Sequence, residues 1–192
     1  MVNALVWRLS TFTTLGIVGV VIPLVFIGVA ILYSPWFDVA NNALSDLGHA
    51  MRSSAASIFN LGLCLGGFIV GTHAVYYMIN VDKLFGLLLT SSGFNLILIA
   101  VFDEVYGTLH FIVSVIFFLM LAVFLVVYSI RFKSVTAIAA VIISLVIWFL
   151  HFVCDIPKGA AIPELVSIVA FITYYIKLLT VLRGSIAKQK LS

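Results

Sequence analysis

Hydrophobic residues form six long runs along this chain. The runs cover residues 11–33, 53–79, 84–102, 108–130, 135–153 and 162–182, and charged residues, Pro or Gly separate them. About 20 apolar residues are enough for a helix to cross roughly 30 Å of hydrocarbon. Within lipid, a helix satisfies every backbone hydrogen bond internally. The pattern therefore predicts an all-α membrane bundle of six transmembrane helices, forming one domain over residues 1–192.

The long connection between the first two runs carries polar residues at helical spacing. Four of them recur at intervals of four, three and four: Asp38, Asn42, Ser45 and His49. Pro35 suits the first position of a helix, and apolar residues fill much of the remaining circumference. We expect a short amphipathic helix that lies at the membrane interface or covers the end of the bundle. Its polar face would lie either in water or inward, over a polar pocket.

Composition supports lipid as the solvent. The chain is 64% hydrophobic and 9% charged, with a mean hydropathy of +1.30, whereas soluble domains average about 25% charged residues. The formal net charge of +3 does not indicate nucleic acid as a partner, because Lys and Arg lie singly in loops and in the C-terminal tail. No basic stripe interleaved with aromatic residues is present. The expected partners are membrane lipids, and the sequence does not determine the oligomeric state.

Basic residues predict the orientation of the bundle. With the N-terminus inside, most Lys and Arg residues fall on the cytoplasmic side, and only Arg52 and Lys158 fall outside. The positive-inside rule then places both termini in the cytoplasm, for a multi-pass protein of the cell membrane. Six of the seven acidic residues fall on the outer side. Because acidic residues have little effect on insertion, their segregation indicates a function at the outer face.

Several segments bring ionisable residues to that outer face. His151 and Asp155 are four residues apart, Asp103 lies two turns before His110, and Glu164 begins the last helix. Such groups usually face the bundle interior or a water-filled cavity. We expect six of them to line one cavity: Asp46, His49, Asp103, His110, His151 and Asp155. Asn42 and Glu164 are further candidates for its lining. Alternatively, the two His–Asp pairs only cap helices, and Glu104 is expected to be solvated.

Two functions fit this outer polar pocket. In the first, the protein is not an enzyme, and the pocket binds a lipid headgroup or a cation. In the second, it is a zinc-dependent intramembrane hydrolase of a lipid amide or ester, with His110, His151 and either His49 or Asp155 as metal ligands. Ser45 or Asp46 would then orient a metal-bound water for attack on the carbonyl. No HExxH or paired CxxC motif identifies a metal, so the cofactor stays open, with zinc as the candidate.

One motif in the long connection resembles a family signature. The stretch Asn42-Ala-Leu-Ser45-Asp46-Leu-Gly48 is similar to the N-x-x-S-D-L-G signature of the prokaryotic membrane family called domain of unknown function 998. Asp103, Gly107 and His110, followed by an apolar helix with two adjacent phenylalanines, resemble that family as well. The resemblance covers nearly the whole chain. It implies the fold and a functional region, but no reaction.

A more distant resemblance concerns the zinc hypothesis. Ser45-x-x-x-His49 looks like the S-x-x-x-H motif of the alkaline ceramidase and adiponectin receptor superfamily, whose members are membrane hydrolases that hold zinc with three histidines. The nearest counterpart of their H-x-x-x-H motif is His151-x-x-x-Asp155. It lies on the fifth helix of six rather than the last of seven, and it ends in Asp. The resemblance therefore serves only as an analogy for the mechanism.

Overall fold

The structure is a computed structural model that describes residues 2–189. The described residues form helices joined by short connections and contain no β-strand. Six of the segments are long and apolar enough to cross a membrane, which confirms the predicted all-α, multi-pass architecture. The long helices are α1 (Val2–Leu32), α2 (Ala56–His73), α4 (Lys83–Val101), α5 (Thr108–Phe132), α6 (Val135–Cys154) and α7 (Ala161–Gln189). A π-helix, η2 (Ala74–Met78), and the short α3 (Ile79–Val81) extend the second span.

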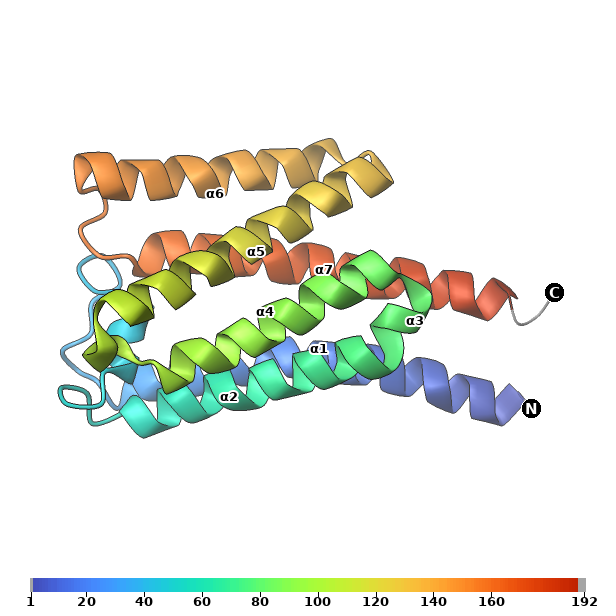
Figure 1. The fold of residues 1–192 in the computed structure, drawn as a ribbon, viewed down its shortest axis with the longest axis horizontal. Coiled ribbons are helices and arrows are strands. Elements are labelled where there is room, and N and C mark those ends of the chain that lie inside the picture. Colours follow the sequence, from blue (N-terminus) through green and yellow to red (C-terminus); the bar gives the residue numbers. More distant parts are fainter. Residues whose placement is uncertain (1, 190–192) are drawn as a thin grey trace.

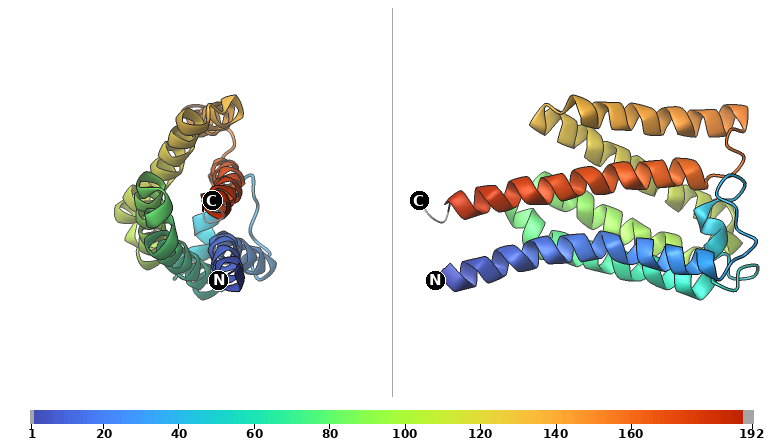
Figure 2. Two further views of the ribbon diagram at one scale, coloured as in Figure 1. Left: turned by 90° about the vertical axis from the view of Figure 1, so that its right-hand side faces the viewer. Right: turned by 180° about the vertical axis from the view of Figure 1, so that it is seen from behind.

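Successive helices follow one another around the bundle, and α7 completes it between α6 and α1 (Figures 1 and 2). Helix α7 contacts α1, α5 and α6. The first turn of α1 and the last turn of α7 lie at the same end of the bundle (Figure 1), which we call the terminal end. The opposite end is formed by residues 33–55, 102–107 and 155–160 and is called the loop end below.

Glycines allow α2 to pack closely against both of its neighbours. A Cβ atom on Gly66 would overlap the ring of Pro23 in α1, and one on Gly67 would overlap the backbone of Gly93 in α4. Small residues at such positions let helix backbones approach closely in membranes. The two pairs of glycines spaced four apart in α2 thus include positions that pack inside the bundle.

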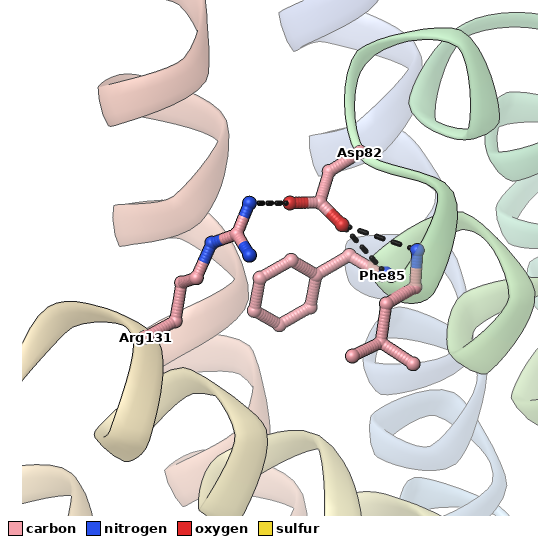
Figure 3. Close-up of polar contacts among 4 residues, drawn as sticks. Asp82, Phe85 and Arg131 are labelled. Carbon is pink, nitrogen blue, oxygen red and sulfur yellow. Dashed lines mark hydrogen bonds and ion pairs between the residues drawn. The ribbon is translucent and has the colours of Figure 1, made fainter.

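At the terminal end, Asp82 caps the start of α4 and forms an ion pair with Arg131 of α5 (Figure 3). The Asp82 carboxylate accepts hydrogen bonds from the backbone N–H groups of Leu84 at 3.1 Å and Phe85 at 3.3 Å. It also accepts one from the guanidinium of Arg131, near the end of α5, at 3.1 Å. Asp82 is the one acidic residue expected on this side, so its role is accounted for by helix capping and helix pairing.

The long connection at the loop end contains less helix than expected. Residues 35–43 form turns, and only Leu44–Gly48 forms a 3-10 helix, η1. The Asp38 carboxylate accepts the N–H of Ala40 at 2.8 Å, and Asn42 Oδ1 accepts the N–H of Asp38 at 2.9 Å. Such local side-chain bonds compete with helical ones. The predicted amphipathic helix is therefore shortened to η1.

The connection from α6 to α7 fixes the position of η1. The N–H of Gly159 bonds to the carbonyl oxygen of Ala40, and the N–H of Ala161 bonds to that of Asn42, both at 2.9 Å. Gly159 lies so close to the Asn42 backbone that a Cβ atom would not fit. These contacts hold η1 next to the first turn of α7.

Helix α6 packs against the rest of the bundle along a narrow stripe. Its buried residues are Ala137, Val141 and Ser144, and most of its other residues are exposed. In Figure 1, α6 stands apart from α1, α2 and α4. The weak packing leaves space between α5, α6 and α7, and the candidate site lies there.

Candidate functional site

A cavity of about 650 Å³ lies between α5, α6 and α7, beneath η1 and the second 3-10 helix, η3 (Glu104–Tyr106). This volume falls within the range of small-molecule sites, roughly 300–1,000 Å³. Polar and ionisable residues line the loop end of the cavity: Ser45, Asp46, His49, Arg52, Glu104, His110, His151 and Glu164. Deeper in the bundle the lining is mainly apolar: Phe118, Leu121, Ala122, Leu125, Val141 and Leu145. The cavity is therefore amphipathic along its length.

Three carboxyl groups from different elements meet at its polar end. Asp46 of η1 and Glu104 of η3 share a hydrogen bond, and the charges of both act on Glu164 of α7. The Ser45 hydroxyl donates to Glu104 Oε1 at 3.1 Å. Glu164 is 7% exposed, and its Oε2 accepts the N–H of Leu44 at 2.6 Å. Leu44 is the first residue of η1, so this hydrogen bond connects η1 to α7.

Asp46 is held in place by its own loop. Its Oδ2 atom accepts the N–H of Ala43 at 2.9 Å and the side-chain amide of Asn42 at 3.1 Å. Both donors lie just before η1, so the carboxylate acts as a cap for this short helix. The capping geometry directs Asp46 towards Glu104 and the cavity.

Glu104 holds a proton at near-neutral pH. Burial raises the pKa of its carboxyl group to about 7, and the hydrogen bond and negative charge of Asp46 act in the same direction. The Ser45 hydroxyl and the positive charge of Arg52 oppose the rise. A hydrogen bond between two carboxyl groups requires that one of them be protonated. With a pKa of about 7, the Glu104 carboxyl group is protonated in about half of the molecules at pH 7.

Backbone carbonyl groups fix the tautomers of two histidines in the lining. Nδ1 of His110 lies 2.7 Å from the carbonyl oxygen of Phe102, and Nδ1 of His151 lies 2.8 Å from that of Pro157. Because a carbonyl oxygen only accepts hydrogen bonds, each Nδ1 carries the hydrogen. In the neutral rings, Nε2 therefore offers a lone pair.

His49 has the opposite tautomer. The backbone N–H of Met51 donates to His49 Nδ1 at 3.3 Å, so in the neutral ring Nε2 carries the hydrogen. The cavity lining thus includes two imidazoles that accept at Nε2 and one that donates there.

Hydroxyl groups extend the polar lining towards the apolar part. Ser114 Oγ lies 3.3 Å from His110 Nε2, one helical turn deeper along α5. The Ser167 hydroxyl accepts the indole N–H of Trp148 at 3.1 Å. Ser144 is buried, and its Oγ has no hydrogen-bond partner within the part of the chain that the structure describes. A buried hydroxyl without a partner is costly, so a polar group of a bound molecule would stabilise this position.

The structure brings together six of the residues singled out from the sequence. Those that line the cavity are Ser45, Asp46, His49, His110, His151 and Glu164. Asn42 does not line the cavity, and its side-chain amide instead donates a hydrogen bond to Asp46. Asp103 does not either, since its carboxylate accepts the N–H of Val105 at 2.9 Å and caps η3.

Asp155 also lies outside the lining. It is exposed and adopts a left-handed conformation at the C-terminal cap of α6. Asp103 and Asp155 therefore lie at helix ends, whereas His110 and His151 line the cavity.

The ligand arrangement expected for zinc is not found. Within residues 2–189, no group of three or more His, Cys, Asp or Glu side chains is arranged to hold a metal ion. Of the proposed ligands, Asp155 lies on an exposed turn, and His49 Nδ1 already accepts the N–H of Met51. His110 and His151 do line the same cavity, but a tetrahedral site needs at least one further ligand.

Some residues of the site were missed by the sequence interpretation. Glu104 was expected in water but is half-buried and bonded to Ser45. Its burial depends on η1 folding back over η3, which no local pattern encodes. Ser114 lies four residues after His110, and helical residues at that spacing share a face. The sequence therefore did contain a signal for Ser114, namely its helical spacing from His110.

Comparison with known proteins identifies a family. The model of the family described as protein of unknown function (DUF998) matches residues 17–181. No curated protein and no solved structure matches the chain. The matched segment includes the first-to-second helix connection with η1, the η3 turn and the start of α7, so all three carboxyl groups of the site lie within it. The chain belongs to the DUF998 family.

Proposed function

We propose that the protein binds an amphiphile with a positively charged amine headgroup in the cavity between α5, α6 and α7. The observation that carries the proposal is the graded lining, with three carboxyl groups at one end and an apolar section along α5 and α6. The headgroup would lie beside Asp46, Glu104 and Glu164, and the chain would lie along Phe118, Leu121 and Leu125.

Charge favours an amine over an anionic headgroup. Three carboxyl groups act on one another at the polar end, and Arg52 is the one Lys or Arg side chain among the described residues of the lining. A cation placed among them would favour their ionised forms and pair with them, whereas a phosphate would be repelled by any that are ionised. Burying charges is favourable only when they are paired in this way.

Access from the bilayer is supported by the exposure of the cavity wall. Phe111, Leu119 and Leu145 line the cavity and are also more than half exposed, at 54%, 56% and 51%. They belong to α5 and α6, whose apolar outer surfaces suit contact with lipid chains. An amphiphile could therefore enter sideways between these helices without leaving the membrane.

Binding of single-chain probes to the purified protein tests the proposal. Native mass spectrometry would compare a long-chain alkylamine with the alcohol and the phosphate of the same chain, and with a short-chain amine. We expect the long-chain amine to bind at least tenfold more tightly than the other three. Equal or tighter binding of the phosphate would contradict the proposal, and equal binding of the short amine would indicate a site for cations alone.

Matched variants locate the binding site. Glu164→Gln and Asp46→Asn remove carboxyl groups that can carry the charge opposite the amine, and should weaken binding of the long-chain amine about tenfold or more, as expected for a charge-assisted contact. Asp103→Asn and Asp155→Asn remove the same charge at the same end of the molecule but outside the cavity lining. These controls should bind like the unmodified protein. An equal loss in all four variants would show only a general surface-charge effect.

A further inference from the structure

Ser114 and His110 form a hydroxyl–imidazole pair on the wall of the cavity. Ser114 Oγ lies 3.3 Å from His110 Nε2, and His110 Nδ1 donates to the carbonyl oxygen of Phe102 at 2.7 Å. The carbonyl group fixes the tautomer, so the lone pair on Nε2 faces the serine hydroxyl. This arrangement of nucleophile, base and orienting acceptor is the one that activates a serine.

The position of this pair suits a carbonyl group of an amphiphile. His110 is in the first turn of α5, near the three carboxyl groups, and Ser114 is one turn deeper. Phe118, Leu121 and Leu125 continue the same wall into the apolar part. From Ser114 to Leu125 the helix extends roughly 16 Å at 1.5 Å per residue. Ser114 thus lies where the polar lining gives way to the apolar lining, the level at which an acyl chain is joined to its headgroup.

The lining also offers a hydrogen-bond donor without a partner. Ser144 of α6 is 6% exposed, and its hydroxyl bonds neither to its own helix nor to any other group described. A helical serine commonly donates to a carbonyl oxygen of the preceding turn, as Ser167 does to Pro163 in the same cavity. The Ser144 hydroxyl is therefore free to donate to an oxygen atom of a bound molecule.

We propose that Ser114 is a nucleophile and His110 its general base, and that together they cleave the ester or amide bond of an amphiphile held in the cavity. The inference rests on the proposed function for the occupant of the cavity. It adds a reaction that requires no metal ion.

Each step of this reaction balances. Ser114 Oγ forms a bond to the carbonyl carbon while its proton moves to His110 Nε2, and Ser144 donates to the carbonyl oxygen. Nε2 then gives the proton to the leaving alcohol or amine as its bond to the carbonyl carbon breaks. Water next attacks the carbonyl carbon of the ester on Ser114 and transfers a proton to Nε2. This proton returns to Ser114 Oγ as the bond between Oγ and that carbon breaks. The products are a carboxylic acid and an alcohol or amine, with no change of oxidation state.

A long-chain alkyl fluorophosphonate tests the nucleophile directly. This probe reacts with an activated serine, whose Oγ displaces fluoride from phosphorus, and the adduct is located by peptide mass spectrometry of the full-length protein. We expect one adduct per chain, on Ser114. Ser114→Ala should abolish it, and His110→Gln should slow its formation at least 100-fold, the lower range for general-base catalysis.

The control is a second serine of the same helix. Ser129 bonds to the carbonyl oxygen of Val126 and lies outside the cavity lining, so Ser129→Ala should label like the unmodified protein. Labelling elsewhere, no labelling, or labelling of His110→Gln at the full rate would overturn the inference. If His110→Gln does not fold, His110→Asn gives the same comparison.

Binding of the alkylamine is measured on the same samples, so the two proposals fail separately. Ser129→Ala lies outside the cavity lining and should bind the amine as tightly as the unmodified protein. Amine binding without any serine adduct would refute the nucleophile and leave the proposed function standing. A Ser114 adduct without amine binding would refute the amine headgroup and leave the nucleophile standing.

Discussion

At the residue scale, the most informative feature is the carboxyl pair of Asp46 and Glu104. One carboxyl group must be protonated for the two to share a hydrogen bond, and the pKa of about 7 at Glu104 reflects burial first and Asp46 second. Perturbed ionisable groups inside a cavity are typical of functional sites. Here the pair sits at the polar end of an amphipathic cavity, so its proton and a bound cation would compete.

Replacing Glu104 with Gln should remove part of the pH dependence of stability. The folded pKa of about 7 lies above the ordinary value of 4.5, so between these values the native state holds a proton that the unfolded chain has lost. Stability therefore falls as pH rises from about 4.5 to 7, and the loss is complete above that range. After allowance for solvent screening of this half-exposed group, we expect a gain of about 1–2 kcal/mol for Glu104→Gln at pH 8.

Thermal unfolding in detergent at pH 5 and pH 8 measures this effect. The unmodified protein should have the lower Tm at pH 8, and the difference between the two pH values should shrink in Glu104→Gln. Asp103→Asn, which neutralises the residue next to Glu104, should keep the full difference. A Glu104→Gln variant with an unchanged pH difference would contradict the proton held by Glu104.

Residue types and spacings predicted only part of the site. His110 and His151 were found because ionisable residues near apolar helices are rare and usually functional. Asp103 and Asp155 matched the same pattern, yet each lies at a helix end and acts as a cap. Glu104 could not be distinguished from a solvated residue, because its burial depends on contacts with Ser45 and Asp46, about 60 positions away in the chain. Short-range spacing does not contain that information.

At the scale of elements, the site depends on the contact between two loops. The 155–160 connection bonds to Ala40 and Asn42, and Glu164 bonds to the N–H of Leu44. These contacts place η1, and thus Asp46, over the start of α7. The predicted amphipathic helix was too long because turn-forming bonds of Asp38 and Asn42 interrupt it. Leu44 and Leu47 of η1 are buried, whereas Ser45 and His49 line the cavity and are only half-buried.

Gly159→Ala should disrupt this contact. A Cβ atom at Gly159 would overlap the backbone of Asn42, and backbone cannot move aside as a side-chain tip can. Overpacking of this kind typically costs about 1–3 kcal/mol. We therefore expect a lower Tm and weaker binding of the long-chain amine, because Asp46 and Glu164 would separate.

Gly28→Ala is the matched control, since a Cβ atom at Gly28 has no neighbour within 4 Å. It should leave binding unchanged and either preserve or slightly raise the Tm, because Ala favours the helix over Gly. Normal binding by Gly159→Ala would show that the loop contact does not position the site.

At the scale of the whole molecule, hydrophobic run length predicted the architecture well. All six expected spans are helices, because a chain in lipid has few other ways to satisfy its backbone. Run length carries no information about how closely each helix packs. The cavity exists because α6 buries so few residues, and that property appears only when the helices are assembled.

The positive-inside rule gives a testable orientation for this bundle. In a variant with Cys64 and Cys154 replaced by Ser, single cysteines at Lys83 and Asp155 would be treated with a membrane-impermeant maleimide on intact cells. We expect labelling at position 155 and none at position 83 until the membrane is permeabilised. Labelling at position 83 alone would invert the bundle and place the cavity in the inner leaflet.

The proton held by Glu104 has a calorimetric consequence. If a singly charged amine replaces that proton, the net charge of the site does not change, and buffer must absorb up to one proton per molecule bound. The measured heat of binding near pH 7 would then depend on the ionisation enthalpy of the buffer, with a slope equal to the number of protons released. In Glu104→Gln this dependence on the buffer should be smaller, so occupancy of the cavity would be tied to proton activity on whichever side of the membrane it faces.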